Sequence, residues 1–315
     1  MPESLDRDRG PVCCDGREPA GDGLERRFQG KPGDIGSVAI SAAGAFFYSR
    51  IRPDAQLANA LSGLIQLILI VVVCAILTYP AAKAGFPYRD ATFYQLDQWL
   101  GFDRAAYLRA FTDLRWKQKL CDSVYLSMLP EMAVIPLVLI LARRTDRLQR
   151  FIAAYGLALA VTTVIFIFAP AVGAFVFVDL TPSDYAKLPA AVYTPARTLD
   201  ALRQGVMTTV PLQNLEGLIA FPSFHTQSAI LYAWALWPIK WMRWPAVLFN
   251  AAIISTTPVS GAHYVVDVIA GALLVGPVIV LSRKLCEDSS SPLADGKDRS
   301  ARQHVGAGTG AVAAK

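Results

Sequence analysis

Residues 61–79 read LSGLIQLILIVVVCAILTY and contain no charged side chain. A helix needs about 20 apolar residues to cross the hydrocarbon core of a bilayer. Charged residues within such a helix are costly and rare. The stretch therefore predicts a transmembrane helix. The whole chain agrees, because its 315 residues are 54% hydrophobic and 17% charged, whereas soluble domains have about 25% charged residues. The same high hydrophobic and low charged content excludes fibrous, collagen-like and fully disordered proteins.

Five further stretches, of 16 to 28 residues, are also predominantly apolar. Each is consistent with a helix that crosses the bilayer. The sequence thus predicts an all-α polytopic membrane protein with six transmembrane helices, the first at 61–79. The others are expected at 123–142, 151–178 (with a possible kink at Pro170), 222–239, 245–260 and 263–281.

The two ends of the chain differ from this membrane domain, which is expected over residues 59–284. Residues 1–58 are predicted to form a disordered tail with a short apolar patch at 37–48, too brief to span and expected at the interface. No apolar core follows a short basic start, so no signal peptide is expected. Residues 285–315 are rich in Ser, Gly, Ala and charge, and predict a disordered C-terminal tail.

Basic residues in the short loops predict the orientation. Four arginines lie between residues 143 and 150, and short loops rich in Arg and Lys stay in the cytoplasm. Because successive connections alternate between the two sides of the membrane, both termini are expected in the cytoplasm and segments 85–122 and 179–221 outside. The membrane is expected to be a plasma or inner membrane. Aromatic and charged residues mixed along 85–122 predict a helix in the interface. The net charge of +5 thus reflects membrane topology, and no nucleic-acid partner is expected.

Two of the three histidines are expected to meet at the outer face. His225 and His263 each begin a predicted span, and 38 residues separate them. As helix this separation is roughly 57 Å at 1.5 Å per residue, about two crossings of a 30 Å bilayer core. The chain therefore crosses inward, turns and returns, so both imidazoles should lie at the same depth.

Asp267 follows His263 by four residues, so the two share a face on a helix. A carboxylate there can accept the imidazole N–H, which fixes the tautomer and leaves the other nitrogen as a nucleophile or base. The alternative is a buried His–Asp pair that only locks helices together.

The segment before His225 suggests an anion site. Pro222 suits the first position of a helix. The N–H groups of Ser223, Phe224 and His225 would then be free to bind a phosphate, with His225 near the leaving oxygen and His263 placed for in-line attack. For Ser223, a simple helix cap is an equally good interpretation.

Two sequences, FPSFHT at 221–226 and STTPVSGAHYVVDVIAG at 255–271, resemble the type 2 phosphatidic acid phosphatase (PAP2) superfamily. The closer likeness is to its inositolphosphotransferase and sphingolipid-synthase-like branch, over about residues 120–284. The resemblance implies a six-helix membrane core with the site at one membrane face. It also implies that His263 attacks phosphorus to give a phosphohistidine, that Asp267 orients His263, and that His225 protonates the leaving oxygen.

The sequence departs from the phosphatase pattern. Phe224 replaces a glycine and Thr257 replaces an arginine, as in the transferase-like branch, and the upstream Lys with Arg-Pro is not recognisable. A phosphate still needs cationic partners. Lys187, Arg197 and Arg203 are the candidates, the alternative being charges that face solvent or headgroups.

Two polar residues lie within predicted spans. Glu131 is expected to pair with an arginine, to face the site, or to mark a misplaced span boundary. Asn250 is expected to pack or to form a hydrogen bond across helices.

These features predict an integral membrane phosphoesterase or phosphotransferase that acts on a lipid phosphate or phosphodiester, without metal or other cofactor. Water as acceptor would give a phosphatase, and a hydroxyl group a transferase. The first alternative is a proton-coupled transporter that uses the His/His/Asp cluster. The second is a two-histidine, one-carboxylate metal site. A soluble vanadate-dependent peroxidase is excluded by the membrane character, and the sequence does not indicate the oligomeric state.

Overall fold

The computed structural model describes residues 55–176, 192–212 and 215–290, together with the single residues 43, 46 and 188. All regular elements in these ranges are helical, as the sequence predicts. The predicted tails lie largely outside the described residues. The helices are α2 (Ala55–Lys83), α3 (Asp90–Trp99), α4 (Arg104–Thr112), α5 (Arg115–Leu126), α6 (Met128–Leu141), α7 (Thr145–Phe168), the 3-10 turn η3 (Ala174–Val176), α9 (Thr194–Arg203), α10 (Phe224–Leu236), α11 (Arg243–Ser260) and α12 (Val265–Ser290).

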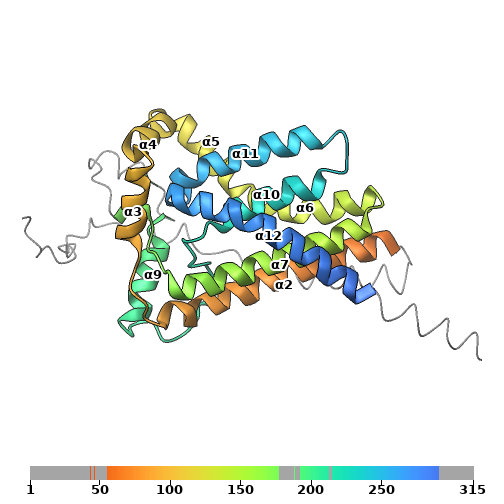
Figure 1. Ribbon diagram of the computed structural model, residues 1–315, viewed down its shortest axis with the longest axis horizontal. Helices are drawn as coiled ribbons and strands as arrows, with labels where there is room; N and C mark the ends of the chain where they lie inside the picture. The colour runs from red at the N-terminus through yellow and green to blue at the C-terminus, as the bar shows by residue number, and fades with distance from the viewer. Residues whose placement is uncertain are drawn as a thin grey trace, which may run out of the picture.

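The longer helices form a bundle along the long axis of the molecule (Figure 1). Helix α10 is central, because it packs against α6, α7, α11 and α12. Helix α2 packs on the outside against α6 and α7. Helices α3, α4 and α9 gather at one end of the bundle (Figure 1), and this end is called the cap below. The turns from α6 to α7 and from α10 to α11 lie at the opposite end.

Within the described part of the chain, three helices are long and apolar enough to cross a membrane: Gln56–Lys83, Thr145–Phe168 and Val265–Glu287. Helices α5 and α6, bent by 43° at their junction, make a fourth crossing if the pair is one span. The membrane character is thus confirmed, whereas six spans are not shown. Helix α10 has 13 residues, or roughly 20 Å of length, which is shorter than the bilayer core.

Several predicted boundaries are wrong. The predicted span at 123–142 is broken at Ser127, between α5 and α6. The predicted span at 151–178 begins earlier and ends at Phe168. Proline disfavours helical geometry at the residue before it, so Pro170 follows the end of α7 and does not kink it. The single interfacial helix expected at 85–122 is three helices, α3, α4 and α5.

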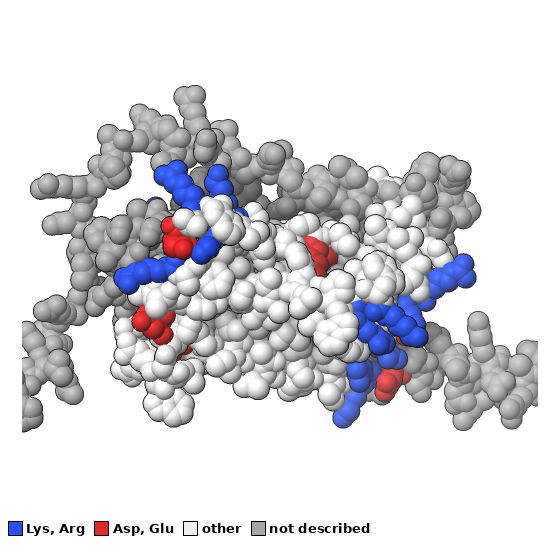
Figure 2. Space-filling view, turned by 90° about the horizontal axis from the view of Figure 1, so that it is seen from above, with Lys and Arg blue, Asp and Glu red and all other residues white. Residues whose placement is uncertain are grey.

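The interior of the bundle is apolar and aromatic. Leu67, Ile135, Phe151 and Leu231, from four different helices, are fully buried in one cluster. On the face shown in Figure 2, Lys and Arg residues lie toward the two ends, and a largely uncharged band lies between them. Such a band matches the surface that a bilayer core requires.

Two polar side chains within the bundle bind each other. Asn250 Nδ2 on α11 donates to Glu131 Oε1 on α6, at 2.8 Å. Glu131 thus pairs with an amide and not with an arginine. Of the two interpretations of Asn250, the structure shows the hydrogen bond across helices and not packing alone.

Candidate active site

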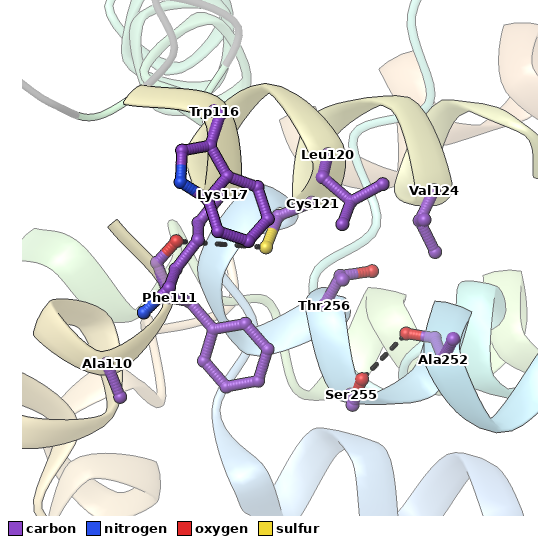
Figure 3. A pocket seen from close by; sticks show the side chains of 10 residues that line it. All are labelled: Ala110, Phe111, Trp116, Lys117, Leu120, Cys121, Val124, Ala252, Ser255 and Thr256. Atoms are coloured by element: carbon purple, nitrogen blue, oxygen red, sulfur yellow. Dashed lines mark hydrogen bonds between the residues drawn. The ribbon is translucent and has the colours of Figure 1, made fainter. Parts of the chain in front are cut away.

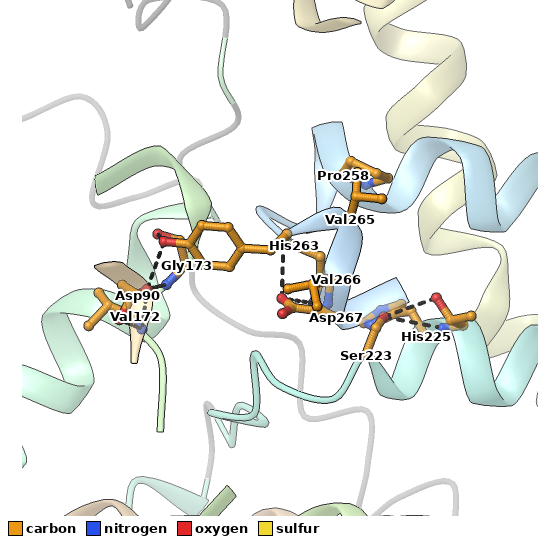
Figure 4. A network of polar contacts seen from close by, with 12 residues as sticks. Asp90, Val172, Gly173, Ser223, His225, Pro258, His263, Val265, Val266 and Asp267 are labelled. Atoms are coloured by element: carbon orange, nitrogen blue, oxygen red, sulfur yellow. Dashed lines mark hydrogen bonds and ion pairs between the residues drawn. The ribbon is translucent and has the colours of Figure 1, made fainter. Parts of the chain in front are cut away.

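The two histidines lie close together (Figure 4), at the end of the bundle where α12 contacts α3 of the cap. His225 lies in the first turn of α10, and His263 lies in the turn between α11 and α12. Their ring centroids are 5.9 Å apart and the rings are inclined by 59°. The predicted meeting of the two imidazoles is therefore confirmed.

His263 is paired with Asp267. Nδ1 of the imidazole lies 3.4 Å from Asp267 Oδ2, and both side chains are buried. Oδ2 also accepts the backbone N–H of Tyr264 at 2.9 Å. His263 precedes α12 and is not part of it, but the spacing of four residues still brings the two side chains together. Because Nδ1 faces the carboxylate, Nε2 remains for a ligand.

Ser223 caps α10. Its hydroxyl group accepts the backbone N–H of Thr226 at 3.3 Å, and its own N–H donates to the carbonyl oxygen of Asp267 at 3.0 Å. The helix begins at Phe224, so the placement of Pro222 at its first position and the free N–H of Ser223 are wrong. The N–H groups of Phe224 and His225 lack acceptors within the helix. Phosphate binding by Ser223 and Phe224 stays a prediction.

Neither departure from the phosphatase pattern brings a cation to the site. The Phe224 ring packs edge-to-face on Tyr155, with centroids 5.2 Å apart. The buried hydroxyl group of Thr257 donates to Ile253 within the same helix. The side chain of Phe224 therefore serves packing, and its backbone N–H is the group that a ligand could use.

Two glycines allow the segments to approach each other closely. A Cβ atom on Gly271 would lie 2.5 Å from the carbonyl oxygen of Ser223. A Cβ atom on Gly261 would lie 2.8 Å from His263 Cδ2 and from the hydroxyl oxygen of Tyr125. Real Cβ atoms do not come so near. Gly271 thus brings α12 against the start of α10, and Gly261 brings the turn before α12 against Tyr125 on α5.

Aspartates on α3, which the sequence analysis missed, hold the segment around His263. Asp97 accepts the N–H groups of Val265 and Val266, each at 3.0 Å, at the start of α12. Carboxylates are favoured at this end of a helix. The residues Asp90 and Asp97 are seven apart, a spacing that places both on one helix face. This seven-residue spacing of two aspartates was the sequence signal from which their role could have been predicted.

Asp90 also holds the segment around His263, through a hydrogen bond with the neighbouring Tyr264. Its carboxylate accepts the N–H groups of Val172 and Gly173 and the hydroxyl group of Tyr264. Burial raises the pKa of the Asp90 carboxyl group, while these hydrogen bonds oppose the rise. Tyr264, beside His263, is thereby tied to α3 of the cap.

Arg104 on α4 compensates the charge of Asp97. The two side chains are buried and 2.8 Å apart, and the guanidinium also donates to the carbonyl oxygen of Pro258 at 3.3 Å. Burial lowers the pKa of Arg104, and the neighbouring Asp97 carboxylate acts in the opposite direction. Arg104 therefore ties the cap to α11 and is engaged by protein groups.

The predicted phosphate-binding cations are placed differently. Lys187 lies outside the described residues, and Arg197 is exposed on α9. Arg203 donates to the carbonyl oxygens of Ala82 and Phe86, and its guanidinium lies 3.6 Å from the Tyr88 ring centroid. Arg203 thus braces α9 against the end of α2. Phosphate binding by all three stays a prediction.

An apolar cavity of about 300 Å³ lies between α4, α5 and α11 (Figure 3). Among the described residues that line it, Lys117 is the one charged side chain, and it pairs with Asp113. Two other lining residues, Val124 and Thr256, directly precede Tyr125 and Thr257 in the chain. The cavity is therefore next to the histidine site but contains none of the predicted site residues.

The metal-site alternative finds no support in the geometry. Among the residues that the structure describes, no three or more His, Cys, Asp or Glu side chains are grouped as a metal site requires.

The fold and the site together define an all-helical membrane protein with two facing histidines, one of them paired with a carboxylate. A family model described as the PAP2 superfamily matches residues 91–281. The chain therefore belongs to the PAP2 superfamily, which indicates a phosphatase-type membrane protein. The match begins within α3 and therefore includes Asp97 and Arg104. Comparisons with curated proteins and with solved structures found no match.

Proposed function

We propose that this protein is an integral membrane phosphoesterase or phosphotransferase that acts on a lipid phosphate or phosphodiester through a phosphohistidine. The observation that carries the proposal is the pair of facing imidazoles, of which His263 alone contacts a carboxylate among the residues that the structure describes. That asymmetry supports two different roles in one phosphoryl transfer.

In the first step, Nε2 of His263 attacks phosphorus. Asp267 holds the proton on Nδ1, which keeps the Nε2 lone pair available, and it stabilises the positive charge that develops on the ring. As the P–N bond forms, the P–O bond to the leaving group breaks. His225 gives its proton to the leaving oxygen, so that an alcohol departs.

In the second step, the acceptor attacks the phosphohistidine. His225, now neutral, takes the acceptor's proton as its oxygen bonds to phosphorus. The P–N bond breaks and returns its electron pair to His263. A covalent intermediate thus divides one difficult transfer into two easier steps. Water as the acceptor gives a phosphate, and a lipid or polyol hydroxyl group gives a new ester.

The membrane arrangement proposed with this chemistry has six spans, α2, α5–α6, α7, α10, α11 and α12, with both termini cytoplasmic. It is supported by the alternating course of these helices along the bundle (Figure 1). The histidines lie at the cap end, while the arginine-rich turn between α6 and α7 lies at the other. The positive-inside rule then assigns the active site to the outer face of a plasma or inner membrane.

The proposed substrate is a lipid, because the site lies at the end of apolar helices and beside an apolar cavity. Placement within the inositolphosphotransferase-like branch is supported by Phe224 and Thr257. Both replace residues of the phosphatase pattern; here the Phe224 ring packs on Tyr155, and the Thr257 hydroxyl group donates to a carbonyl oxygen of its own helix.

A substrate panel tests the proposal. Membranes containing the protein are incubated with labelled phosphatidic acid, polyprenyl diphosphate or phosphatidylinositol, each with and without ceramide or diacylglycerol. Membranes containing His263→Ala at equal expression are the matched control. Product that forms only with the unchanged protein identifies donor and acceptor, whereas equal product in both membranes contradicts the proposal.

Reporter fusions test the topology separately. A reporter after Leu281 should read cytoplasmic, and one near Arg197 should read external. Readings on the same side of the membrane would overturn the six-span arrangement and the shared outer face of the histidines.

A further inference from the structure

The partner of His225 is an aromatic residue outside the motifs that define the site. Tyr125, near the end of α5, stacks on His225 with ring centroids 4.2 Å apart and planes inclined by 16°. The Tyr125 hydroxyl group lies 3.2 Å from His225 Nδ1. Ring and hydroxyl group thus engage the same imidazole.

This contact leaves one nitrogen of His225 for the substrate. A phenol hydroxyl group both donates and accepts hydrogen bonds. When His225 is neutral, Tyr125 donates to the Nδ1 lone pair, and Nε2 carries the proton. In either protonation state the hydroxyl group occupies the Nδ1 side of the ring, so Nε2 is the nitrogen through which a ligand can exchange a proton with His225.

Tyr125 also contacts the segment that carries the other histidine. The close approach of its hydroxyl oxygen to Gly261 leaves no room there for a Cβ atom. One turn earlier on α5, Asp122 Oδ1 accepts the hydroxyl group of Ser260 at 2.8 Å. Helix α5 is thus anchored at the turn before His263 and presents Tyr125 to His225.

We propose that Tyr125 is a positioning residue for His225: it fixes the ring plane by stacking and reserves Nε2 for the transferred proton by engaging Nδ1. The inference rests on the proposed function, because it assigns His225 the proton transfer. Tyr125 itself touches no reacting atom, and no bond to it forms or breaks.

The test compares leaving groups. Alkyl esters need a proton on the departing oxygen, whereas a 4-nitrophenolate leaves without one. The probes are phosphatidic acid with 4-nitrophenyl phosphate, and phosphatidylinositol with a 4-nitrophenyl inositol phosphodiester. The variants are Tyr125→Phe, which keeps the ring, and Tyr125→Leu, which removes the stack as well. Tyr107→Phe is the matched control, because it removes a tyrosine hydroxyl group that donates to Ser255 at 2.7 Å and touches no histidine.

Tyr125→Phe should slow the alkyl ester on the order of tenfold, a part of the roughly 10²-fold or more that general acid catalysis contributes. Tyr125→Leu should slow it further, and neither variant should change the aryl ester more than Tyr107→Phe does. The acid–base limbs of the alkyl pH–rate profile should shift in Tyr125→Phe. Combined with His225→Ala, Tyr125→Phe should add no further loss, because both act through one group.

Equal losses on alkyl and aryl esters, additivity with His225→Ala, or no loss at all would overturn the role of Tyr125. The failure of the proposed function has a different signature, which is turnover that survives His263→Ala. If neither ester of a pair is turned over by the unchanged protein, the proposed function and this inference fall together.

Discussion

His263 and His225 lie within one site but are held by different chemistry. His263 is buried and faces the Asp267 carboxylate, whereas His225 is partly buried and faces the neutral hydroxyl group of Tyr125. An anionic partner favours the positively charged ring that a nucleophile acquires on attack. A neutral hydroxyl group does not stabilise the positively charged ring in this way, so it favours transfer of the His225 proton. The difference indicates that the two imidazoles are suited to different roles in phosphoryl transfer, His263 as the nucleophile and His225 as the acid–base residue.

The backbone supports of the two residues differ as well. His263 lies in an irregular turn after Ala262, which has φ of +54°, and Asp97 secures the start of α12 behind it. His225 is part of a regular helix whose first turn is capped by Ser223. The support of His263 thus depends on the cap, while that of His225 depends on helix geometry.

Asp267→Asn should have the largest effect, because an amide can hold the wrong imidazole tautomer and cannot stabilise the charged ring. In serine proteases the equivalent change costs about 10⁴ in rate, and we expect a loss of that order. Turnover of the panel's lipid substrate measures it. Asp113→Asn, at an exposed residue that pairs with Lys117, is the control, and comparable losses in both variants would contradict the assignment.

His225→Ala should slow alkyl ester turnover by about 10² to 10⁴-fold, the usual contribution of general acid–base catalysis. The loss should be smaller for a 4-nitrophenyl ester, because its leaving group departs without a proton. Rates on both esters provide the measurement. If the two rates fall by the same factor, His225 does not supply the proton and the contrast between the histidines disappears.

Asp97→Ala should act through the support of His263. It leaves Arg104 buried without its carboxylate, and breaking a buried pair in this way costs about 3 to 5 kcal/mol of stability. The unfolding temperature in detergent should fall accordingly. Asp113→Ala, which breaks an exposed pair on the same side of the molecule, should leave it nearly unchanged. Equal shifts would show that the cap does not hold the turn.

Gly271→Ala should have the smallest effect of the four. A methyl group there meets the Ser223 carbonyl oxygen, and overpacking costs typically about 1 to 3 kcal/mol. Activity should fall with stability, because the start of α10 must shift. Gly276→Ala on the same helix is the control, since its Cβ would meet no atom within 4 Å, and alanine favours helix. A stable, fully active Gly271→Ala variant would mean that the start of α10 can shift without disturbing the position of His225.

The helical class and the meeting of the two histidines could be predicted from the sequence, because both depend on the lengths of apolar stretches and on the spacing of residues along the chain. It misplaced the starts and ends of helices at Ser127, Phe168 and Phe224, where the capping geometry and a following proline decide the boundary. The roles of Tyr125, Asp97 and Arg104 depend on contacts between distant segments. A single sequence does not record such contacts, so these residues appeared only in the folded chain.

The most direct test is to trap and locate the phosphoenzyme. Membranes are incubated with a phosphoryl-labelled lipid donor, quenched, and examined for label on the protein that is acid-labile and base-stable. The label should map to His263, disappear in His263→Ala, and persist in His225→Ala with slower formation. Label on another residue, or normal turnover by well-expressed His263→Ala, would contradict the phosphohistidine mechanism and leave the His263–Asp267 pair as a lock between helices.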